Sequence, residues 1–338
     1  MNTQTAFCGD AVSTQTEFET HEKSTQTLVI MNDKCIQTLP DTFFARIKDT
    51  DQLTALTGLN SFQLFESVCA GVKKYIDTFC PDLLRGQTLS YRDQVLLTLN
   101  KLKQNSSFTL LSVYFQVSRK TCSRYFRVMI RILSIILKNY ISVPSRDAIQ
   151  DNLPSSFSQF AVCKFVLDCT EVPVCKPACI RCRTQMYSFY YGRHTLKILI
   201  GATPCGLITH VSPFYGGKAS DKFIFEKSQI VQQCDPGDSI MVDKGFRVEQ
   251  ECKEHNVDLL QPTFKTAGRQ LNAEECERSR LISTARVHVE RVMERLKNFR
   301  ILREEIEWHY LGEMNNVVVT IAGLVNLSPP LLGPDSFK

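Results

Sequence analysis

From residue 160 onwards, short aliphatic and β-branched runs alternate with segments of helical periodicity, and this alternation most constrains the fold. Short apolar runs bounded by polar or turn-forming residues are typical of strands. The runs lie at 164–167, 196–200, 207–211 and 240–242. Because strands that alternate with helices build layered sheets, the pattern predicts an α/β domain over residues 160–330.

The preceding part of the chain, from residue 51 to about 140, has a purely helical pattern. Its apolar residues recur at steps of three and four, as in Val95, Leu96, Leu99 and Leu102. This spacing predicts an all-α domain over residues 45–141. Residues 142–160 contain two prolines and several serines, so they are expected to be a linker.

Residues 1–40 are rich in Thr, Gln, Ser and Asn and have few large apolar side chains. Such a segment cannot bury enough surface to offset its chain entropy, which predicts a flexible arm. Within it a Gln-Thr pair recurs every eleven residues, at Gln4, Gln15, Gln26 and Gln37. The copy at Thr25, Gln26 and Thr27 resembles the short extended motif bound by the dynein light chain hub, which implies that hub as a partner. A polar linker without a receptor is the alternative.

Bulk composition restricts the class of protein. The 43% hydrophobic fraction is typical of soluble globular chains, and no apolar run reaches the length of a membrane span. The first residues lack a signal sequence, so we expect an intracellular protein with no membrane association. The fourteen cysteines are therefore expected to stay reduced, and the uneven spacing of the run from Cys169 to Cys182 favours free thiols over a zinc site.

Positive charge is concentrated in the helical domain. The whole chain carries +5, whereas residues 89–140 hold nine Lys or Arg against the single acid Asp93. A basic block of this kind is typical of a surface that binds a phosphate backbone.

Within that block, residues 107–133 have the pattern of helix, short turn, helix. Gln116 and Val117 form the expected turn, and Ser118 is placed to cap the second helix. On a helical wheel the cations of the second helix share one face and its apolar residues the other. This geometry is typical of a helix-turn-helix reader of double-stranded DNA, and a solvated basic helix is the alternative. The predicted contacts are Lys120, Ser123, Arg124, Arg127 and Arg131.

Two of the expected strands are each followed at once by an aspartate, Asp168 after 164–167 and Asp243 after 240–242. The carboxyl ends of strands in an α/β sheet meet at one ligand-binding edge, so both oxygens can share a crevice. A third acid, Glu290, lies on a helix pattern over 285–299 whose opposite face is apolar. Taken alone, the row of charged side chains on the Glu290 face of this helix is equally typical of solvated ion pairs one turn apart.

Crowded carboxylates repel one another, and hard divalent cations relieve that repulsion. The set predicts a site for two Mg²⁺ or Mn²⁺ ions, the arrangement used for in-line phosphoryl displacement. Lys244, Arg286 and Lys297 are expected to neutralise phosphate or to bind the DNA strand.

Several runs resemble the DDE superfamily endonuclease domain of PIF/Harbinger-like transposases. They are FVLDCTEVPV, PGDSIMVDKGF and ARVHVERVMERLKNFRIL, and the block around SRKTCSRYF resembles the helix-turn-helix domain that accompanies it. The resemblance implies a ribonuclease-H-like fold with a catalytic triad, which here is Asp168, Asp243 and Glu290. It also implies a supporting acid at Asp221, for which a helix N-terminal acid is the alternative.

The resemblance implies a transposase that cuts and joins DNA in the nucleus. A host-adopted DNA-binding protein that has lost cleavage is the first alternative, and an interaction scaffold that works through its repeat arm is the second. A homo-oligomer is compatible with all three.

Overall fold

A computed structural model describes residues 42–263 and 270–329. The chain divides into two units, residues 1–46 and 47–338, and every element from α2 onwards belongs to the second. The first contributes one short described element, the 3-10 helix η1 (Phe43–Arg46). The predicted arm, with Thr25, Gln26 and Thr27, lies outside the described residues.

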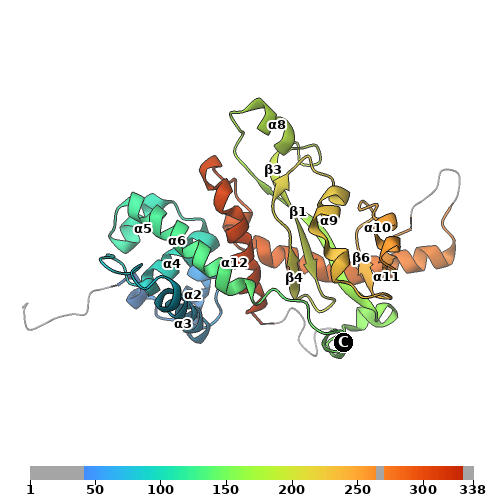
Figure 1. Cartoon of the computed structure of the whole chain (residues 1–338), viewed down its shortest axis with the longest axis horizontal. Helices are drawn as coiled ribbons and strands as arrows, with labels where there is room; N and C mark the ends of the chain where they lie inside the picture. The colour runs from blue at the N-terminus through green and yellow to red at the C-terminus, as the bar shows by residue number, and fades with distance from the viewer. Residues whose placement is uncertain (1–41, 264–269, 330–338) are drawn as a thin grey trace, which may run out of the picture. The chain divides into compact units, whose positions relative to one another are not determined.

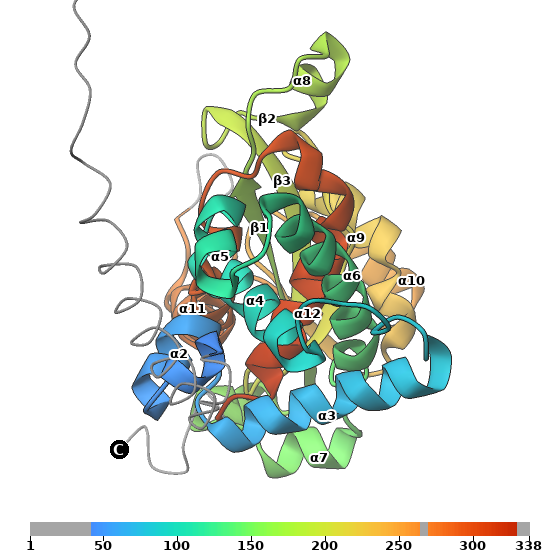
Figure 2. The same ribbon diagram turned by 90° about the vertical axis from the view of Figure 1, so that its left-hand side faces the viewer.

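The all-α region predicted from helical periodicity is confirmed. Its helices are α2 (Thr50–Thr57), α3 (Phe62–Phe79), α4 (Tyr91–Gln104), α5 (Phe108–Phe115) and α6 (Arg119–Lys138). Each begins after a serine or aspartate whose side chain accepts a hydrogen bond from the first turn, which satisfies a backbone donor that the helix itself leaves free. Phe65, Leu99 and Phe126 are among the fully buried side chains that pack these helices together. Figure 2 shows α2 to α6 grouped together.

The segment expected to be a linker is instead structured. It contains helix α7 (Arg146–Asp151) and the 3-10 helix η2 (Ser155–Phe160). Phe157 is fully buried there and stacks near His288, and the Ser156 hydroxyl lies 2.8 Å from the His288 ring nitrogen. The segment is structured because Phe157 and Phe160, which are both buried, anchor residues whose composition is otherwise typical of a loop.

The second part of the unit is built on a mixed sheet (Figure 1). Its strands are β1 (Cys163–Pro173), β2 (Tyr187–Ser188), β3 (Arg193–Ala202), β4 (Ile208–Val211), β5 (Tyr215–Gly216), β6 (Ser239–Met241) and β7 (Asp258–Leu260). β3 is antiparallel to β1 and β4, whereas β6 is parallel to β1 and β7 parallel to β6. Three antiparallel strands followed by two parallel ones give the predicted ribonuclease-H-like α/β fold.

Helices pack on the sheet through alternate residues of its strands. Phe165 and Leu167 of β1 lie in a buried cluster with α9 (Asp221–Ser228), the 3-10 helix η3 (Ile230–Gln233) and α10 (Glu249–Glu254). The long helix α11 (Ala273–Lys297) contacts β1, and α12 (Met314–Asn326) contacts β4 (Figure 1). Because neighbouring residues of a strand point to opposite faces of the sheet, the even-numbered side chains of β1 point towards the face that α11 covers.

Helix α12 also joins the sheet to the helical domain, since it packs against α6. At their closest approach Gly323 faces Leu137, and a β-carbon at Gly323 would lie only 2.7 Å from the Leu137 carbonyl oxygen. The glycine therefore lets the two backbones approach. The structure shows no helix among the described residues that has the length and apolar character to cross a membrane.

Candidate functional site

The register of two parallel strands brings Asp168 and Asp243 to the same level of the sheet. Val166 of β1 pairs with Met241 of β6, and each aspartate follows its strand partner by two residues. Neighbouring strands lie about 5 Å apart, so the two carboxylates project from adjacent positions. The sequence placed Asp168 at the end of a strand, but β1 continues to Pro173 because its antiparallel pairing with β3 extends that far. Asp168 therefore lies within β1, at a level of the sheet just beyond the end of the neighbouring strand β6.

Asp168 is the most strongly perturbed acid of this group. Burial raises its pKa to about 6, and the negative charges of Asp243 and Asp221 act in the same direction. The Arg286 guanidinium and a hydrogen bond of 2.9 Å from the Cys169 backbone N–H to Asp168 Oδ1 oppose the rise. Perturbed acids of this kind gather at functional sites, where a ligand supplies the missing charge compensation.

Two cations of α11 face these acids. The Arg286 guanidinium is 2.9 Å from Asp243 Oδ1, and its side chain is only 11% exposed. Burial lowers the pKa of Lys297, which the nearby charges of Asp168 and Glu171 partly restore. Both cations predicted on this helix therefore lie beside the carboxylates. The third predicted cation, Lys244, is exposed, and its backbone N–H donates to Asp243 Oδ1 at 2.7 Å.

Glu290 lies on the same stripe of α11 as these cations, one turn after Arg286. Its side chain is exposed, in contrast to the buried Val289 and Val292 that anchor the helix. Over residues 42–263 and 270–329 no three His, Cys, Asp or Glu side chains form a group that could hold a metal ion. The structure thus brings together Asp168, Asp243 and Arg286, with Glu290 on the adjoining helix.

The chemistry of these side chains fits a hard divalent cation. Asp168 and Asp243 offer carboxylate oxygens, which Mg²⁺ and Mn²⁺ prefer. The raised pKa of Asp168 shows that its ionised form lacks sufficient compensating charge, although Arg286 is nearby. A cation held by Asp168 and Asp243 would supply that charge.

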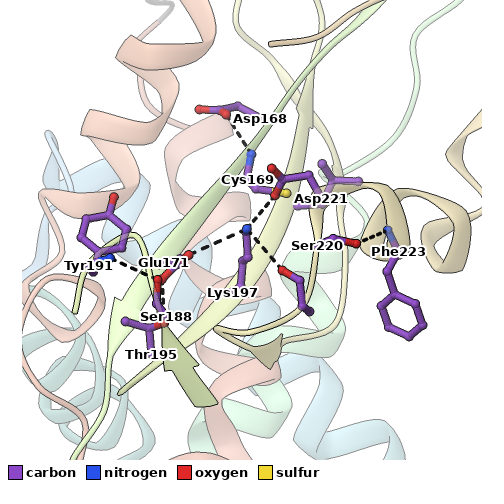
Figure 3. A network of polar contacts seen from close by, with 12 residues as sticks. Asp168, Cys169, Glu171, Ser188, Tyr191, Thr195, Lys197, Ser220, Asp221 and Phe223 are labelled. Carbon is purple, nitrogen blue, oxygen red and sulfur yellow. Dashed lines mark hydrogen bonds and ion pairs between the residues drawn. The ribbon is translucent and has the colours of Figure 1, made fainter. Parts of the chain in front are cut away.

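A second set of charges lies beside the first, around Lys197 of β3 (Figure 3). The Lys197 ammonium is 2.8 Å from Asp221 Oδ1 and 3.8 Å from Glu171, and its side chain is 14% exposed. Glu171 in turn accepts a hydrogen bond from the Thr195 hydroxyl. Asp221 is the first residue of α9, so it is a helix N-terminal acid. Its negative charge also raises the pKa of Asp168.

Sequence reasoning named Asp221 but missed Lys197, Glu171 and Thr195. One signal for Lys197 was present, namely a single lysine within an apolar strand run. A lysine is rarely buried without a partner, so that position indicated an acid on a neighbouring element. Which acids these would be depended on the folded chain, because Glu171 faces Lys197 through the strand register whereas Asp221 comes from helix α9.

In the helical region the predicted helix, turn and helix are confirmed. α5 ends at Phe115, Gln116 adopts a left-handed conformation, and Ser118 Oγ accepts a hydrogen bond from the Thr121 N–H at 3.1 Å. The cations of α6 line a hollow of about 530 Å³ together with the 3-10 helix η5 (Trp308–Glu313). Its polar lining includes Arg119, Lys120, Ser123, Arg124, Arg127 and His309.

Arg131 differs from the other predicted contacts of α6. Its guanidinium donates two hydrogen bonds to Glu313, whose side chain is only 8% exposed. The pair links α6 to the segment that begins α12. Arg131 therefore has a structural partner, and its contact with DNA stays a prediction.

The cysteines are free thiols wherever they are described. Cys175 donates a hydrogen bond to Glu305, and Cys169 is close enough to Asp221 to bond to it. Burial raises the pKa of Cys163, Cys234 and Cys252 to about 12, so these thiols are not reactive nucleophiles.

Comparison with known protein families accounts for both parts of this arrangement. Residues 167–326 match the model described as DDE superfamily endonuclease. This part of the chain, called the DDE domain below, is therefore similar to DDE endonucleases. Residues 87–139 match the model described as the helix-turn-helix of DDE superfamily endonuclease, and the two matches together support a DDE transposase. Neither a curated protein nor a solved structure matches the chain significantly.

Proposed function

We propose that the protein is a PIF/Harbinger-like transposase that hydrolyses phosphodiester bonds of double-stranded DNA and joins the freed 3′ end to a target. The observation that carries this proposal is the placement of Asp168 and Asp243 at one level of adjacent parallel strands, within the domain that matches the DDE endonucleases. Glu290, an exposed acid of α11, would be the third ligand.

Asp168, Asp243 and Glu290 would hold two divalent ions, Mg²⁺ or Mn²⁺. When bound, such ions lower the pKa of a water and neutralise charge on the phosphate. The chain's own residues position the substrate: Arg286 and Lys297 lie beside the carboxylates and can contact phosphate oxygens. Lys197 holds Asp221 in place, and Asp221 supports the site through its charge next to Asp168.

The second helix of the helix-turn-helix, α6, would contact both the DNA backbone and base edges. The contacting residues would be Lys120, Ser123, Arg124 and Arg127. Arg124 is partly positioned already, because it donates to Gln87 at 2.9 Å and lies over the Tyr125 ring. This face would dock in a major groove while the DDE domain reaches the phosphate to be cut.

Nicking of supercoiled plasmid in Mg²⁺ or Mn²⁺ tests the proposal. Asp168→Asn, Asp243→Asn and Glu290→Gln should each abolish nicking, because each removes one charge from the metal site. Glu294→Gln is the matched control, since Glu294 is an exposed acid one turn further along α11. The proposal fails if wild-type protein binds DNA but does not nick it with either metal. That outcome would identify a host-adopted DNA-binding protein derived from a transposase.

Two further expectations accompany this function. A transposase acts on chromosomal DNA, so the proposal places the protein in the nucleus, which imaging of a tagged chain tests. The repeat segment at Thr25, Gln26 and Thr27 would bind a dynein light chain hub, and calorimetric titration of the full chain into that hub tests it against a variant with all four repeats replaced. Equal heats for the two chains would leave the arm without this partner.

A further inference from the structure

A projecting segment between β1 and β3 carries most of the strongly exposed aromatic surface of the DDE domain. We call residues 176–193 the finger, which comprises α8 (Ile180–Met186), β2 and the turn into β3. Ile180, Phe189 and Tyr190 are 76%, 80% and 87% exposed, and Tyr191 is 45% exposed. Large apolar side chains gathered at this level of exposure mark an interaction surface.

The turn that bears these rings is held in one conformation. The Ser188 carbonyl accepts a hydrogen bond from the Gly192 N–H at 2.9 Å, and the buried Ser188 hydroxyl accepts one from the Tyr191 N–H. Gly192 has φ +65, which a residue with a side chain rarely adopts. Neighbouring rings also fix one another, since Tyr190 and Tyr191 meet edge to face at 4.9 Å between ring centroids. The backbone that carries Phe189 and Tyr190 is thus held in one turn, and both side chains are exposed.

The base of the finger is fixed to the sheet by close backbone packing. A β-carbon at Gly217 would collide with the Thr195 hydroxyl and lie 2.9 Å from the Met186 carbonyl oxygen. The Lys218 N–H donates to the Gln185 carbonyl at 3.2 Å. Because glycine allows this approach, α8 and β2 are attached firmly to β5 and β3.

The charge of this region is entirely positive. Between Glu171 and Asp221 the sequence contains no Asp or Glu, whereas it contains six Lys or Arg. Arg181 and Arg193 are exposed on the finger, and the Arg193 guanidinium lies 5.8 Å from the centre of the Tyr191 ring. Exposed aromatic rings interleaved with cations are the arrangement that binds unpaired nucleotides, through stacking and phosphate attraction.

The finger leaves the sheet from the two strands that flank the carboxylate site. The pairing of β1 with β3 ends at Pro173 and Thr195, five residues beyond Asp168 along β1. Tyr191 of the finger lies next to Glu171 in Figure 3, and burial raises its pKa together with the nearby charge of Glu171. A DNA strand on the finger can therefore continue along β1 towards the site where DNA would be cut.

We propose that the finger binds DNA that is unpaired beside the cut phosphate, with Phe189 and Tyr190 stacked on exposed bases and Arg181 and Arg193 at the backbone. This inference deepens the proposed nuclease function and rests on it for the position of the cut. A second copy of the chain is a poorer occupant, because a symmetric contact would bring the same cations face to face.

The test compares binding of two fluorescein-labelled duplexes that differ only in a central bubble of four mismatched pairs, measured by anisotropy in EDTA. Wild-type protein should bind the bubble at least about tenfold more tightly than the paired duplex, the preference expected from one stacked base. Phe189→Ala combined with Tyr190→Ala should remove the preference and leave affinity for the paired duplex within about twofold. Both side chains are exposed, so the denaturation midpoint of this variant should match wild type.

Two controls separate stacking from other effects. Phe189→Tyr combined with Tyr190→Phe keeps both rings and should keep the preference. Phe79→Ala removes an aromatic side chain that is 68% exposed in α3 and should also keep it. Three outcomes would each overturn the inference. The double alanine variant could retain the preference for the bubble, or wild type could bind the two duplexes equally. The double alanine variant could also differ from wild type in molar mass by light scattering.

The assay contains no divalent metal, so it reports the finger independently of cleavage. Absence of nicking together with a bubble preference that requires the rings would refute the proposed nuclease and leave the finger as a DNA-binding element. Nicking without such a preference would refute only the finger.

Discussion

Replacing the half-buried Asp168 should make the protein more stable. Asp168→Asn removes a charge that burial disfavours and that Asp243 and Asp221 repel. Asparagine retains an oxygen that can accept the 2.9 Å hydrogen bond from the Cys169 N–H. We therefore expect the free energy of unfolding to rise at neutral and alkaline pH in the absence of divalent metal.

The size of the effect follows from linkage. The pKa of Asp168 rises from 3.8 to about 6 on folding. Each pKa unit is worth about 1.4 kcal/mol, so ionisation of Asp168 lowers the free energy of unfolding by about 3 kcal/mol at pH 8. Because the folded pKa is the higher one, this penalty is absent below pH 3.8, grows as the pH rises towards 6 and is constant above it. At pH 5 roughly half of it is present.

Guanidinium unfolding of wild type and variant at pH 5 and pH 8 in EDTA measures this penalty directly. The variant should gain about 3 kcal/mol at pH 8 and roughly half as much at pH 5. Asp151→Asn is the control, because Asp151 is an exposed acid at the end of α7 and its replacement should change stability by less than about 0.5 kcal/mol.

A gain in stability that does not depend on pH, or a loss of stability at pH 8, would refute the electrostatic reasoning.

Addition of Mg²⁺ to the same unfolding measurement is a second test. The ion should stabilise wild type more than Asp168→Asn, because only the wild type offers the full carboxylate set. Equal stabilisation of both proteins would mean that Asp168 is not a ligand.

Three other perturbations have defined outcomes. Gly323→Ala should lower the free energy of unfolding by about 1–3 kcal/mol in denaturant melts, because its β-carbon would press into α6, whereas Gly312→Ala, with nothing within 4 Å, should not. Lys120→Gln should reduce the slope of log affinity for DNA against log salt by about 0.9, and an unchanged slope would remove Lys120 from the interface. Arg131→Gln should lower the unfolding midpoint, and a double-mutant cycle with Glu313→Gln should be non-additive if the observed pair stabilises the domain contact.

The local features of the fold were the most predictable from the sequence. The boundaries of α5 and α6 followed from Gln116 and Ser118, because a left-handed turn residue and an N-cap act on their immediate neighbours. The strand positions were also close, since β3 and β6 include most of the runs expected at 196–200 and 240–242. The exact end of β1 was not predictable, because it depends on how far its pairing with β3 extends.

The ion pairs of the site could not be predicted in the same way. Asp168, Asp243 and Glu290 were selected by chemistry and resemblance, which need only the residues themselves. The partners Arg286–Asp243 and Lys197–Asp221 join elements far apart in the sequence, so they depend on register and helix rotation in the folded chain. Phe157 shows the same principle, because only its tertiary burial distinguishes η2 from a loop.

The ion pairs Arg286–Asp243 and Lys197–Asp221 differ in how easily they can be broken. Asp243 is 52% exposed, so water can solvate its carboxylate when the pair opens, and Arg286, which is 11% exposed, would still have the negative charge of Asp168 nearby. Lys197 and Asp221 are 14% and 27% exposed, and removing one partner there leaves a charge that water solvates poorly. The Asp243 side of the site is therefore the part that can rearrange for metal and phosphate, while Lys197 and Asp221 keep the adjoining strand edge fixed. Since the finger leaves the sheet along β3, the strand that bears Lys197, the pairing of β3 with β1 and β2 fixes the base of the finger relative to Asp168.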